Sequence, residues 1–264
     1  MKKKISKFNL GIFQGRLTDS VILQKFPKDW EKEFYIANLL KLNHIEFFLE
    51  QRKNNINPFW TKKGRKKILF HVKKNFKSHK FVLCDNYIIN KNLYNSRSEI
   101  YLKKILSNLK DFKLSILILP INSFYFENTL KLTDYFNKIF ENIDKKIEIS
   151  FEADADSRKV KLFLQKLNYR NVGITFDIGN VFNKNKNIIH YYKSISSLVN
   201  HIHIKDRDLE GRNVKLGSGK INLKKFFQIL QNKKFKKLIT LETYRKENSI
   251  TNIFENKNYL KKLL

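Results

Sequence analysis

Residues 199–207 read Val-Asn-His-Ile-His-Ile-Lys-Asp-Arg, and the alternation in this stretch is typical of a β-strand. Successive side chains of a strand point to opposite faces. His201, His203 and Lys205 therefore share one face, while Ile202 and Ile204 share the other. A strand that is buried on both faces is normally apolar on both. The face with two imidazoles and an ammonium must therefore meet water, a ligand or a metal ion.

Three other predicted strands end with an ionisable residue on their less apolar face. They are Glu148-Ile-Ser-Phe-Glu152, Gly173-Ile-Thr-Phe-Asp177 and Leu238-Ile-Thr-Leu-Glu242. If these strands lie beside residues 199–205, the side chains of Glu152, Asp177, His203 and Glu242 converge. Carboxylates that are buried together repel one another, and each is costly to remove from water unless a cation pairs with it. The pattern therefore predicts one divalent metal ion held by these four residues.

Eight predicted strands alternate with helical segments along the chain. We expect the strands at residues 8–16 (running into a loop), 44–49, 80–84, 114–119, 146–152, 171–177, 199–205 and 237–242. We expect the helices at residues 29–42, 61–77, 97–110, 127–143, 157–167, 188–198, 222–231 and 249–263. This alternation is typical of a parallel α/β fold. Eight such units in 264 residues predict an α/β fold with a single (β/α)8 TIM barrel domain over residues 1–264, whose site lies at the C-terminal ends of the strands.

The charge of the chain has two interpretations. Its 54 Lys and Arg outnumber 24 Asp and Glu, which gives a formal net charge of +30. Such a charge suits a nucleic-acid or other anionic partner, but an AT-rich genome also makes Lys, Asn, Ile and Phe abundant. The lysines are spread along the whole chain, so we favour the second interpretation and expect no nucleic-acid partner. The charge would still favour anionic substrates such as sugar phosphates, and the backbone N–H groups of Leu216-Gly-Ser-Gly219 are a candidate phosphate cradle.

The compartment is indicated by cysteine content and by terminal composition. Cys84 is the one cysteine, so an internal disulfide and a cysteine-based zinc site are excluded, and a reducing compartment fits. The basic start Met-Lys-Lys-Lys is not followed by the apolar stretch of a signal peptide. No apolar run approaches the roughly 18 residues that a membrane span needs. We therefore expect a cytoplasmic protein with no membrane partner.

At its polar strand ends the sequence resembles the xylose isomerase-like barrel superfamily, the sugar phosphate isomerase/epimerase group. The matching stretches are Phe151-Glu-Ala153, Thr175-Phe-Asp-Ile-Gly-Asn180, His201-Ile-His-Ile-Lys-Asp206, Leu216-Gly-Ser-Gly219, Leu241-Glu-Thr243 and, at the start, Gly11-Ile-Phe-Gln-Gly-Arg16. The resemblance spans the chain. Its His-Ile-His-Ile-Lys-Asp stretch with the downstream Leu-Gly-x-Gly is fairly specific for the superfamily, but for no single substrate.

The resemblance implies a reaction. In the ketose 3-epimerase branch, two glutamates, an aspartate and a histidine at the ends of strands five to eight hold a divalent metal, and the glutamates act as acid and base. These roles map onto Glu152, Asp177, His203 and Glu242, with Glu152 and Glu242 catalytic. The implied function is a metal-dependent isomerase or epimerase of a sugar or sugar phosphate that acts through a metal-bound cis-enediolate. Three carboxylates and one imidazole suit Mn2+ first, with Mg2+, Co2+ or Zn2+ as alternatives. Relatives are commonly dimers or tetramers, so a homo-oligomer is an open expectation.

Five further residues are candidates for binding substrate: Arg16, Glu46, Asn180, Lys205 and Arg207. Glu46 lies mid-strand, where it either faces the same interior as the metal ligands or pairs with a nearby Lys or Arg. Arg16 and Arg207 suit an anionic or hydroxylated substrate, and a surface salt bridge is the equal alternative for each. Lys205 shares the face of the metal-binding histidine. Asn180 stands where the epimerase branch has a histidine, so it can form hydrogen bonds but cannot titrate, and this leaves the exact reaction open.

Three other functions stay open as alternatives. A dehydratase, or a related enolisation of a keto-sugar, inosose or keto acid, would use the same metal and enediolate. An endonuclease IV-like DNA repair enzyme would need a three-zinc cluster with more histidine ligands than the 6 histidines of this chain supply. A non-catalytic binding barrel would not need both glutamates.

Overall fold

Eight parallel strands close into a barrel in the computed structural model, which describes residues 8–18, 25–52, 54, 56–184, 187–244 and 248–263. The barrel strands are β1 (Asn9–Phe13), β2 (Ile45–Leu49), β3 (Phe81–Asp85), β4 (Ser115–Pro120), β5 (Ile147–Glu152), β6 (Val172–Asp177), β7 (Val199–Ile204) and β10 (Leu238–Leu241). They follow chain order around the barrel, and β10 pairs with β1 to close it. The predicted (β/α)8 TIM barrel is confirmed.

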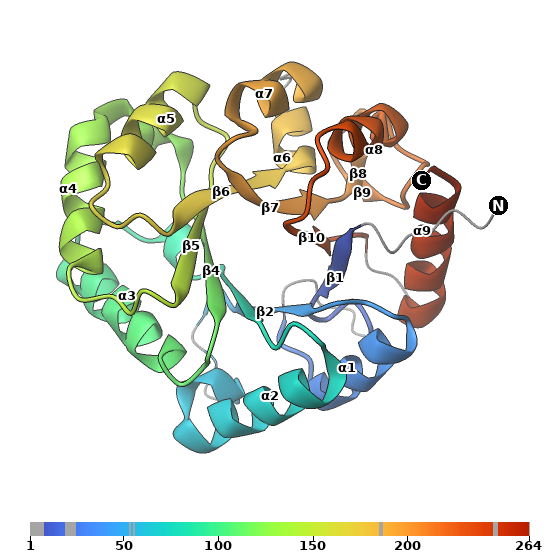
Figure 1. Ribbon diagram of the computed structural model, residues 1–264, viewed down its shortest axis with the longest axis horizontal. Helices are drawn as coiled ribbons and strands as arrows, with labels where there is room; N and C mark the ends of the chain where they lie inside the picture. The colour runs from blue at the N-terminus through green and yellow to red at the C-terminus, as the bar shows by residue number, and fades with distance from the viewer. Residues whose placement is uncertain are drawn as a thin grey trace.

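Helices form a ring outside the strands (Figure 1). They are α1 (Trp30–Leu39), α2 (Lys62–Asn75), α3 (Ser96–Leu109), α4 (Thr129–Phe140), α5 (Ser157–Lys166), α7 (Ile188–Ile195), α8 (Leu223–Asn232) and α9 (Ser249–Leu263). Each corresponds to one of the predicted helices. The sequence pattern does not predict the short helices η2 (Pro58–Trp60), η3 (Ile88–Asn90), η4 (Ser123–Asn128) and α6 (Ile178–Asn183), or the hairpin of β8 (Asp206–Arg207) and β9 (Asn213–Val214).

Polar side chains fix the starts of several helices. Asn95 accepts a hydrogen bond from the backbone N–H of Ser98 at the start of α3, and Asn128 accepts one from Lys131 at the start of α4. The side chain of Asp156 does the same for α5. Such caps satisfy N–H groups that have no partner within the helix, so the helices begin where the sequence supplies a capping residue.

The apolar core lies between the barrel wall and the helices. Phe81 of β3 stacks on Phe112 with ring centroids 4.0 Å apart. Phe136 of α4 and Phe163 of α5 both meet Phe151 of β5 edge to face, at 4.8 and 4.9 Å. Aromatic pairs of this kind add to the stabilisation that burial already provides. They anchor the helices to the outward faces of the strands.

The interior of the barrel is polar at mid-height, although bulky branched residues usually fill this space. His44, Glu46, His201 and Thr240, which we call the polar layer, are each at most 1 % exposed. The Thr240 hydroxyl lies 2.9 Å from Nε2 of both His44 and His201. A Cβ atom on Gly11 would lie 2.3 Å from the His44 ring, so the glycine provides the space that this imidazole fills.

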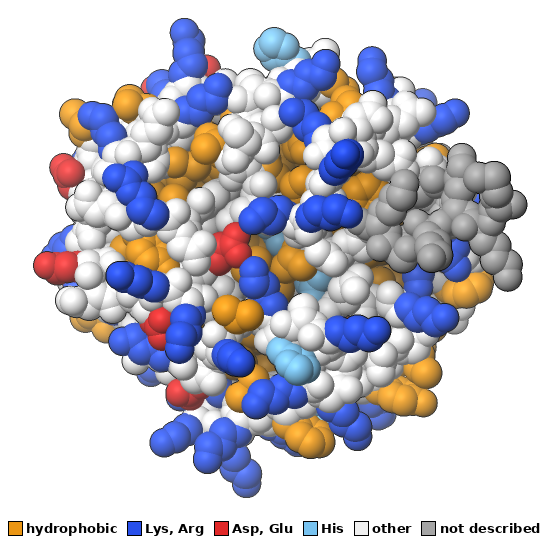
Figure 2. Space-filling model, in the orientation of Figure 1, with side chains coloured by type: hydrophobic (Ala, Val, Ile, Leu, Met, Phe, Trp, Pro, Cys, Tyr) orange, Lys and Arg blue, Asp and Glu red, His pale blue; other side chains and the backbone are white. Residues whose placement is uncertain are grey.

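Charged side chains are scattered over the surface. Lys and Arg side chains are distributed around the whole face shown in Figure 2, with uncharged atoms between them. This arrangement matches their spread along the sequence. Within the described part of the chain, no helix has the length and apolar character needed to cross a membrane.

Candidate active site

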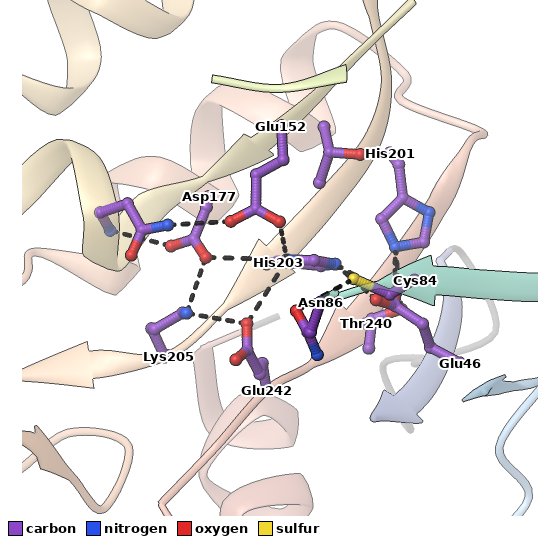
Figure 3. A network of polar contacts seen from close by, with 12 residues as sticks. Glu46, Cys84, Asn86, Glu152, Asp177, His201, His203, Lys205, Thr240 and Glu242 are labelled. Atoms are coloured by element: carbon purple, nitrogen blue, oxygen red, sulfur yellow. Dashed lines mark hydrogen bonds and ion pairs between the residues drawn. The ribbon is translucent and has the colours of Figure 1, made fainter. Parts of the chain in front are cut away.

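Four side chains at neighbouring strand ends meet inside the barrel mouth (Figure 3). His203 Nδ1 lies 3.5 Å from Glu152 Oε2, 3.6 Å from Asp177 Oδ2 and 3.4 Å from Glu242 Oε2. The strand register explains why they meet. Asp177 and Thr240 are the partners of His203 on the two neighbouring strands. Glu242 lies two residues after Thr240 and therefore on the same face of its strand. The structure thus brings together all four residues that the sequence predicts as metal ligands.

Backbone and side-chain hydrogen bonds orient two of the carboxylates. Asp177 caps α6, and its Oδ1 accepts a hydrogen bond from the Asn180 N–H at 2.9 Å. Its Oδ2 is left to face the site. Asn180 Nδ2 donates to Glu152 Oε1 at 2.8 Å, which leaves Glu152 Oε2 toward His203. Asn180, expected to bind substrate, therefore also holds one of the two glutamates.

Lys205 places a positive charge within the same cluster. Its Nζ lies 2.6 Å from Asp177 Oδ2 and 2.7 Å from Glu242 Oε2. The side chain is 5 % exposed, and its stem passes over Gly179, where a Cβ atom would lie 2.4 Å from Lys205 Cγ. The ammonium pairs with two of the carboxylates and balances part of their charge.

Burial and charge shift the proton affinities of the cluster. Burial, together with the charges of Asp177 and Glu242, raises the pKa of Glu152 to about 8. Burial alone would raise the pKa of Asp177, but the Lys205 ammonium and His203 hold it well below its usual range. Burial alone would lower the pKa of His203, but the carboxylates around it, Glu46 first, raise it well above its usual range. The site is therefore a tightly coupled set of charges.

The donor atoms suit a divalent metal ion. His203 Nδ1 is buried without a hydrogen-bond partner among the described residues. The carboxylate oxygens around it lie too far away for a hydrogen bond. Together with Nδ1 they form a set of oxygen and nitrogen ligands that Mn2+, Mg2+, Co2+ and Zn2+ accept. Ligand atoms of Glu152, Asp177 and His203 lie within 4.8 Å of one another. A bound ion would need the Lys205 ammonium to move aside, since it contacts two of the same carboxylates.

A cavity of about 190 Å³ opens on the Glu152 side of the cluster. Its polar lining comprises Asn122, Ser123, Glu152, Asp154, Thr175, Asp177, Asn180 and Lys184. Lys184 Nζ lies 4.0 Å from Asp154 Oδ2. The sequence analysis did not identify Lys184. Its position four residues after Asn180 could have done so, because residues with this spacing lie on the same side of a helix.

The other expected substrate-binding residues occupy different surroundings. Glu46 is fully buried below His203, where its carboxylate accepts hydrogen bonds from imidazoles. Arg16 is 2 % exposed, donates from Nε to the Thr243 carbonyl oxygen at 3.0 Å, and has its guanidinium carbon 5.2 Å from the Phe13 ring centroid. Arg207 Nη1 donates to the carbonyl oxygen of Gly211 at 2.8 Å. Arg16 is therefore a buried residue, and Arg207 fastens the β8–β9 hairpin.

The expected phosphate cradle at residues 216–219 is wrong. The N–H groups of Gly217 and Gly219 donate to Asp206 Oδ2 at 2.9 and 3.0 Å, and that of Ile221 donates to Asp206 Oδ1 at 3.2 Å. A carboxylate of this chain already fills the place that a phosphate would take. Asp206, whose role the sequence reasoning also missed, organises this loop from within.

Comparisons with known proteins agree on the fold. A family model described as xylose isomerase-like TIM barrel matches residues 127–263. No curated protein sequence shows significant similarity to the chain.

Solved structures resemble the chain over almost its whole length. D-psicose 3-epimerase from Clostridium cellulolyticum H10, solved with D-tagatose, superposes with a TM-score of 0.74 at 10 % identity, over 97 % of this chain and 99 % of that chain. The probable 3-DHS dehydratase from Bacillus anthracis has a TM-score of 0.69 at 10 % identity, over 96 % and 98 %. The IOLI protein with a bound zinc atom has a TM-score of 0.70 at 12 % identity, over 97 % and 99 %. At these identities the similarity is one of fold.

Proposed function

Because the chain belongs to the xylose isomerase-like TIM barrel family, we propose that it is a divalent-metal-dependent isomerase or epimerase of a sugar or sugar phosphate. Glu152, Asp177, His203 and Glu242 would hold the ion, with Mn2+ as the first choice. Glu152 and Glu242 would also act as acid and base. Two of the similar structures, an epimerase solved with D-tagatose and a protein with bound zinc, support this class of reaction.

One observation carries the proposal: two glutamates approach a single imidazole nitrogen from opposite sides. Glu152 Oε2 and Glu242 Oε2 lie 3.5 and 3.4 Å from His203 Nδ1, above and below it in the view of Figure 3. Epimerisation removes a proton from one face of a carbon and returns a proton to the other, so it needs two such groups. A barrel that only binds a ligand would not need both.

The residues of the chain divide the work. When bound, a divalent ion polarises the carbonyl of a hydroxy-ketone and stabilises negative charge on its oxygens. Glu242 would accept the proton from carbon, since it approaches His203 Nδ1 from the side opposite to Glu152. Glu152 would deliver a proton from Oε2, because its Oε1 already accepts from Asn180. Delivery to the opposite face gives an epimer, and delivery to the neighbouring carbon gives an isomer.

Elemental analysis of the purified protein beside its His203→Ala variant tests the metal site. We expect one divalent ion per wild-type chain and its loss from the variant. Wild-type protein that holds no divalent ion after reconstitution would refute the proposal, and three zinc ions per chain would favour the DNA-repair alternative. Ketoses and ketose phosphates are then incubated with the Mn2+-loaded protein in deuterated water, and we expect deuterium at the carbon beside the carbonyl.

A dehydratase is the second candidate, and the position of the cavity favours it. Glu152 lines the cavity, whereas Glu242 is absent from its described lining. Elimination of water needs an acid beside the leaving hydroxyl, and one carboxyl group on the cavity side would serve. The two functions differ in their products: an unsaturated or deoxygenated product that is formed with loss of water would select the dehydratase, and a stereoisomer or positional isomer would select the isomerase.

A further inference from the structure

A buried carboxylate stands directly behind the imidazole at the centre of the site. Glu46, in the middle of β2, is fully buried, and its Oε1 and Oε2 lie 2.9 and 3.1 Å from His203 Nε2 (Figure 3). Oε2 also lies 2.9 Å from His201 Nε2. One carboxylate is therefore shared by two imidazoles, and it contacts the ring nitrogen of His203 that faces away from the candidate metal ligands.

This contact decides which nitrogen of His203 is available to a ligand. An ionised carboxylate can only accept hydrogen bonds, so the hydrogen between Glu46 and His203 belongs to Nε2. Nδ1, which faces Glu152, Asp177 and Glu242 at 3.4 to 3.6 Å, is then the nitrogen that is directed at the candidate metal position. A carboxylate behind a ligating histidine fixes the orientation of the ring and makes the nitrogen a better donor.

The polar layer holds Glu46 in place in turn. His201 Nε2 lies within 2.9 Å of both Glu46 Oε2 and the Thr240 hydroxyl. That hydroxyl also meets His44, whose ring is packed against Gly11. Each group is buried and hydrogen-bonded to the next, so the carboxylate of Glu46 cannot turn away without leaving a buried imidazole unpaired.

We propose that Glu46 is a positioning residue that holds His203 with Nδ1 directed at the metal ligands, in place of the substrate contact that the sequence suggested. The inference rests on the proposed metal-dependent function. Glu46 itself touches neither the ion nor the substrate. Its contribution is to fix the direction of the ring, so that Nδ1 faces the three carboxylates.

The variant Glu46→Gln tests this role through metal affinity. The glutamine is isosteric, but it carries no negative charge and keeps only one oxygen that can accept, so it holds Nε2–H of His203 more weakly than the carboxylate does. Calorimetric titration with Mn2+, and with Co2+ followed by its visible absorption, should show affinity that is weaker by about 10- to 100-fold and an altered Co2+ spectrum. Asp85→Asn is the matched control, because it also replaces a fully buried carboxyl group on a neighbouring strand by an amide, but one that contacts Tyr101 of α3. It should leave metal affinity unchanged.

A second control separates the orientation of His203 from general damage to the polar layer. His201→Gln disturbs the same layer but leaves an amide that can still donate to Glu46, so the pair of Glu46 and His203 is kept and metal affinity should stay within a few-fold of wild type. An equal loss in His201→Gln and Glu46→Gln would overturn the inference, as would wild-type affinity in Glu46→Gln.

If Glu46→Gln does not fold, Glu46→Asp, which is too short to reach both imidazoles, should show the same loss. Wild-type protein that binds neither ion would overturn the proposed function and this inference with it, whereas a metal-binding wild type with an unaffected variant would overturn the inference alone.

Discussion

The substitution Asp85→Asn should stabilise the protein at alkaline pH and have a much smaller effect at acidic pH. Asp85 ends β3 and is fully buried. Its Oδ1 accepts hydrogen bonds from the Tyr87 N–H and the Tyr101 hydroxyl, both at 3.0 Å. Its Oδ2 is buried and has no hydrogen-bond partner among the described residues. Burial raises the pKa of this carboxyl group from 3.8 to about 7.

The direction of this pH dependence follows from the order in which the unfolded and the folded protein lose the proton of Asp85. As the pH rises from about 4, the unfolded chain ionises Asp85 first, while the folded protein keeps the proton until the pH nears 7. The free energy of unfolding therefore falls through this window, and the full penalty is present above it. The difference between 3.8 and about 7, at about 1.36 kcal/mol for each pKa unit, corresponds to about 4 kcal/mol.

Asparagine removes this penalty because it resembles the protonated carboxyl group and cannot ionise. Its Oδ1 can still accept from Tyr87 and Tyr101. Urea unfolding of variant and wild type at pH 5 and pH 8.5 gives the difference in their free energies of unfolding at each pH. We expect that difference to favour the variant by about 3 kcal/mol more at pH 8.5 than at pH 5. A difference that is the same at both pH values would refute the reasoning, since any fixed cost of the amide is independent of pH.

Three further predictions concern the site and its loop. Glu152→Gln and Glu242→Gln should each lower turnover by about 100- to 10,000-fold with an unchanged circular dichroism spectrum, and normal turnover in either would exclude a two-glutamate mechanism. Lys205→Met should strengthen Mn2+ binding in calorimetry, because the ammonium no longer competes for the carboxylates that it contacts at 2.6 and 2.7 Å; equal or weaker binding would contradict this. Asp206→Ala should lower the free energy of unfolding in urea by about 3 kcal/mol or more, because buried N–H groups lose their acceptor, and a loss below about 1 kcal/mol would show that water replaces the carboxylate.

The barrel and the meeting of the four predicted ligands could be foreseen because both depend on the period of the sequence. Alternation along each strand assigns a side chain to a face, and in a parallel barrel the C-terminal strand ends lie together. Glu152, Asp177, His203 and Glu242 needed no further information to be placed at one end of the interior. The boundaries of seven strands were accurate to within one residue because apolar runs mark them, whereas the first strand, predicted over residues 8–16, ends at Phe13.

Contacts between distant segments could not be read from that period. The carboxylate of Glu46 meets His203 157 positions away, and only the closed barrel brings their strands face to face. Lys205 shares a face with His203, but the direction of its long flexible side chain depends on Gly179 beneath it. The N–H groups of Gly217 and Gly219 suggested a phosphate site because the sequence does not show which group accepts their hydrogen bonds. Their acceptor, Asp206, is brought to them by the tertiary structure.

The polar layer also has a consequence for how the chain selects its strand register during folding. A slip of one residue turns every side chain of a strand to the opposite face. If β7 slipped in this way, His201 and His203 would enter the aromatic packing under the helices, and Ile202 and Ile204 would face the carboxylate of Glu46. Both placements leave buried polar groups without partners. Misregistered barrels are therefore penalised twice, and the arrangement that we propose as a metal site also discriminates against misfolded alternatives.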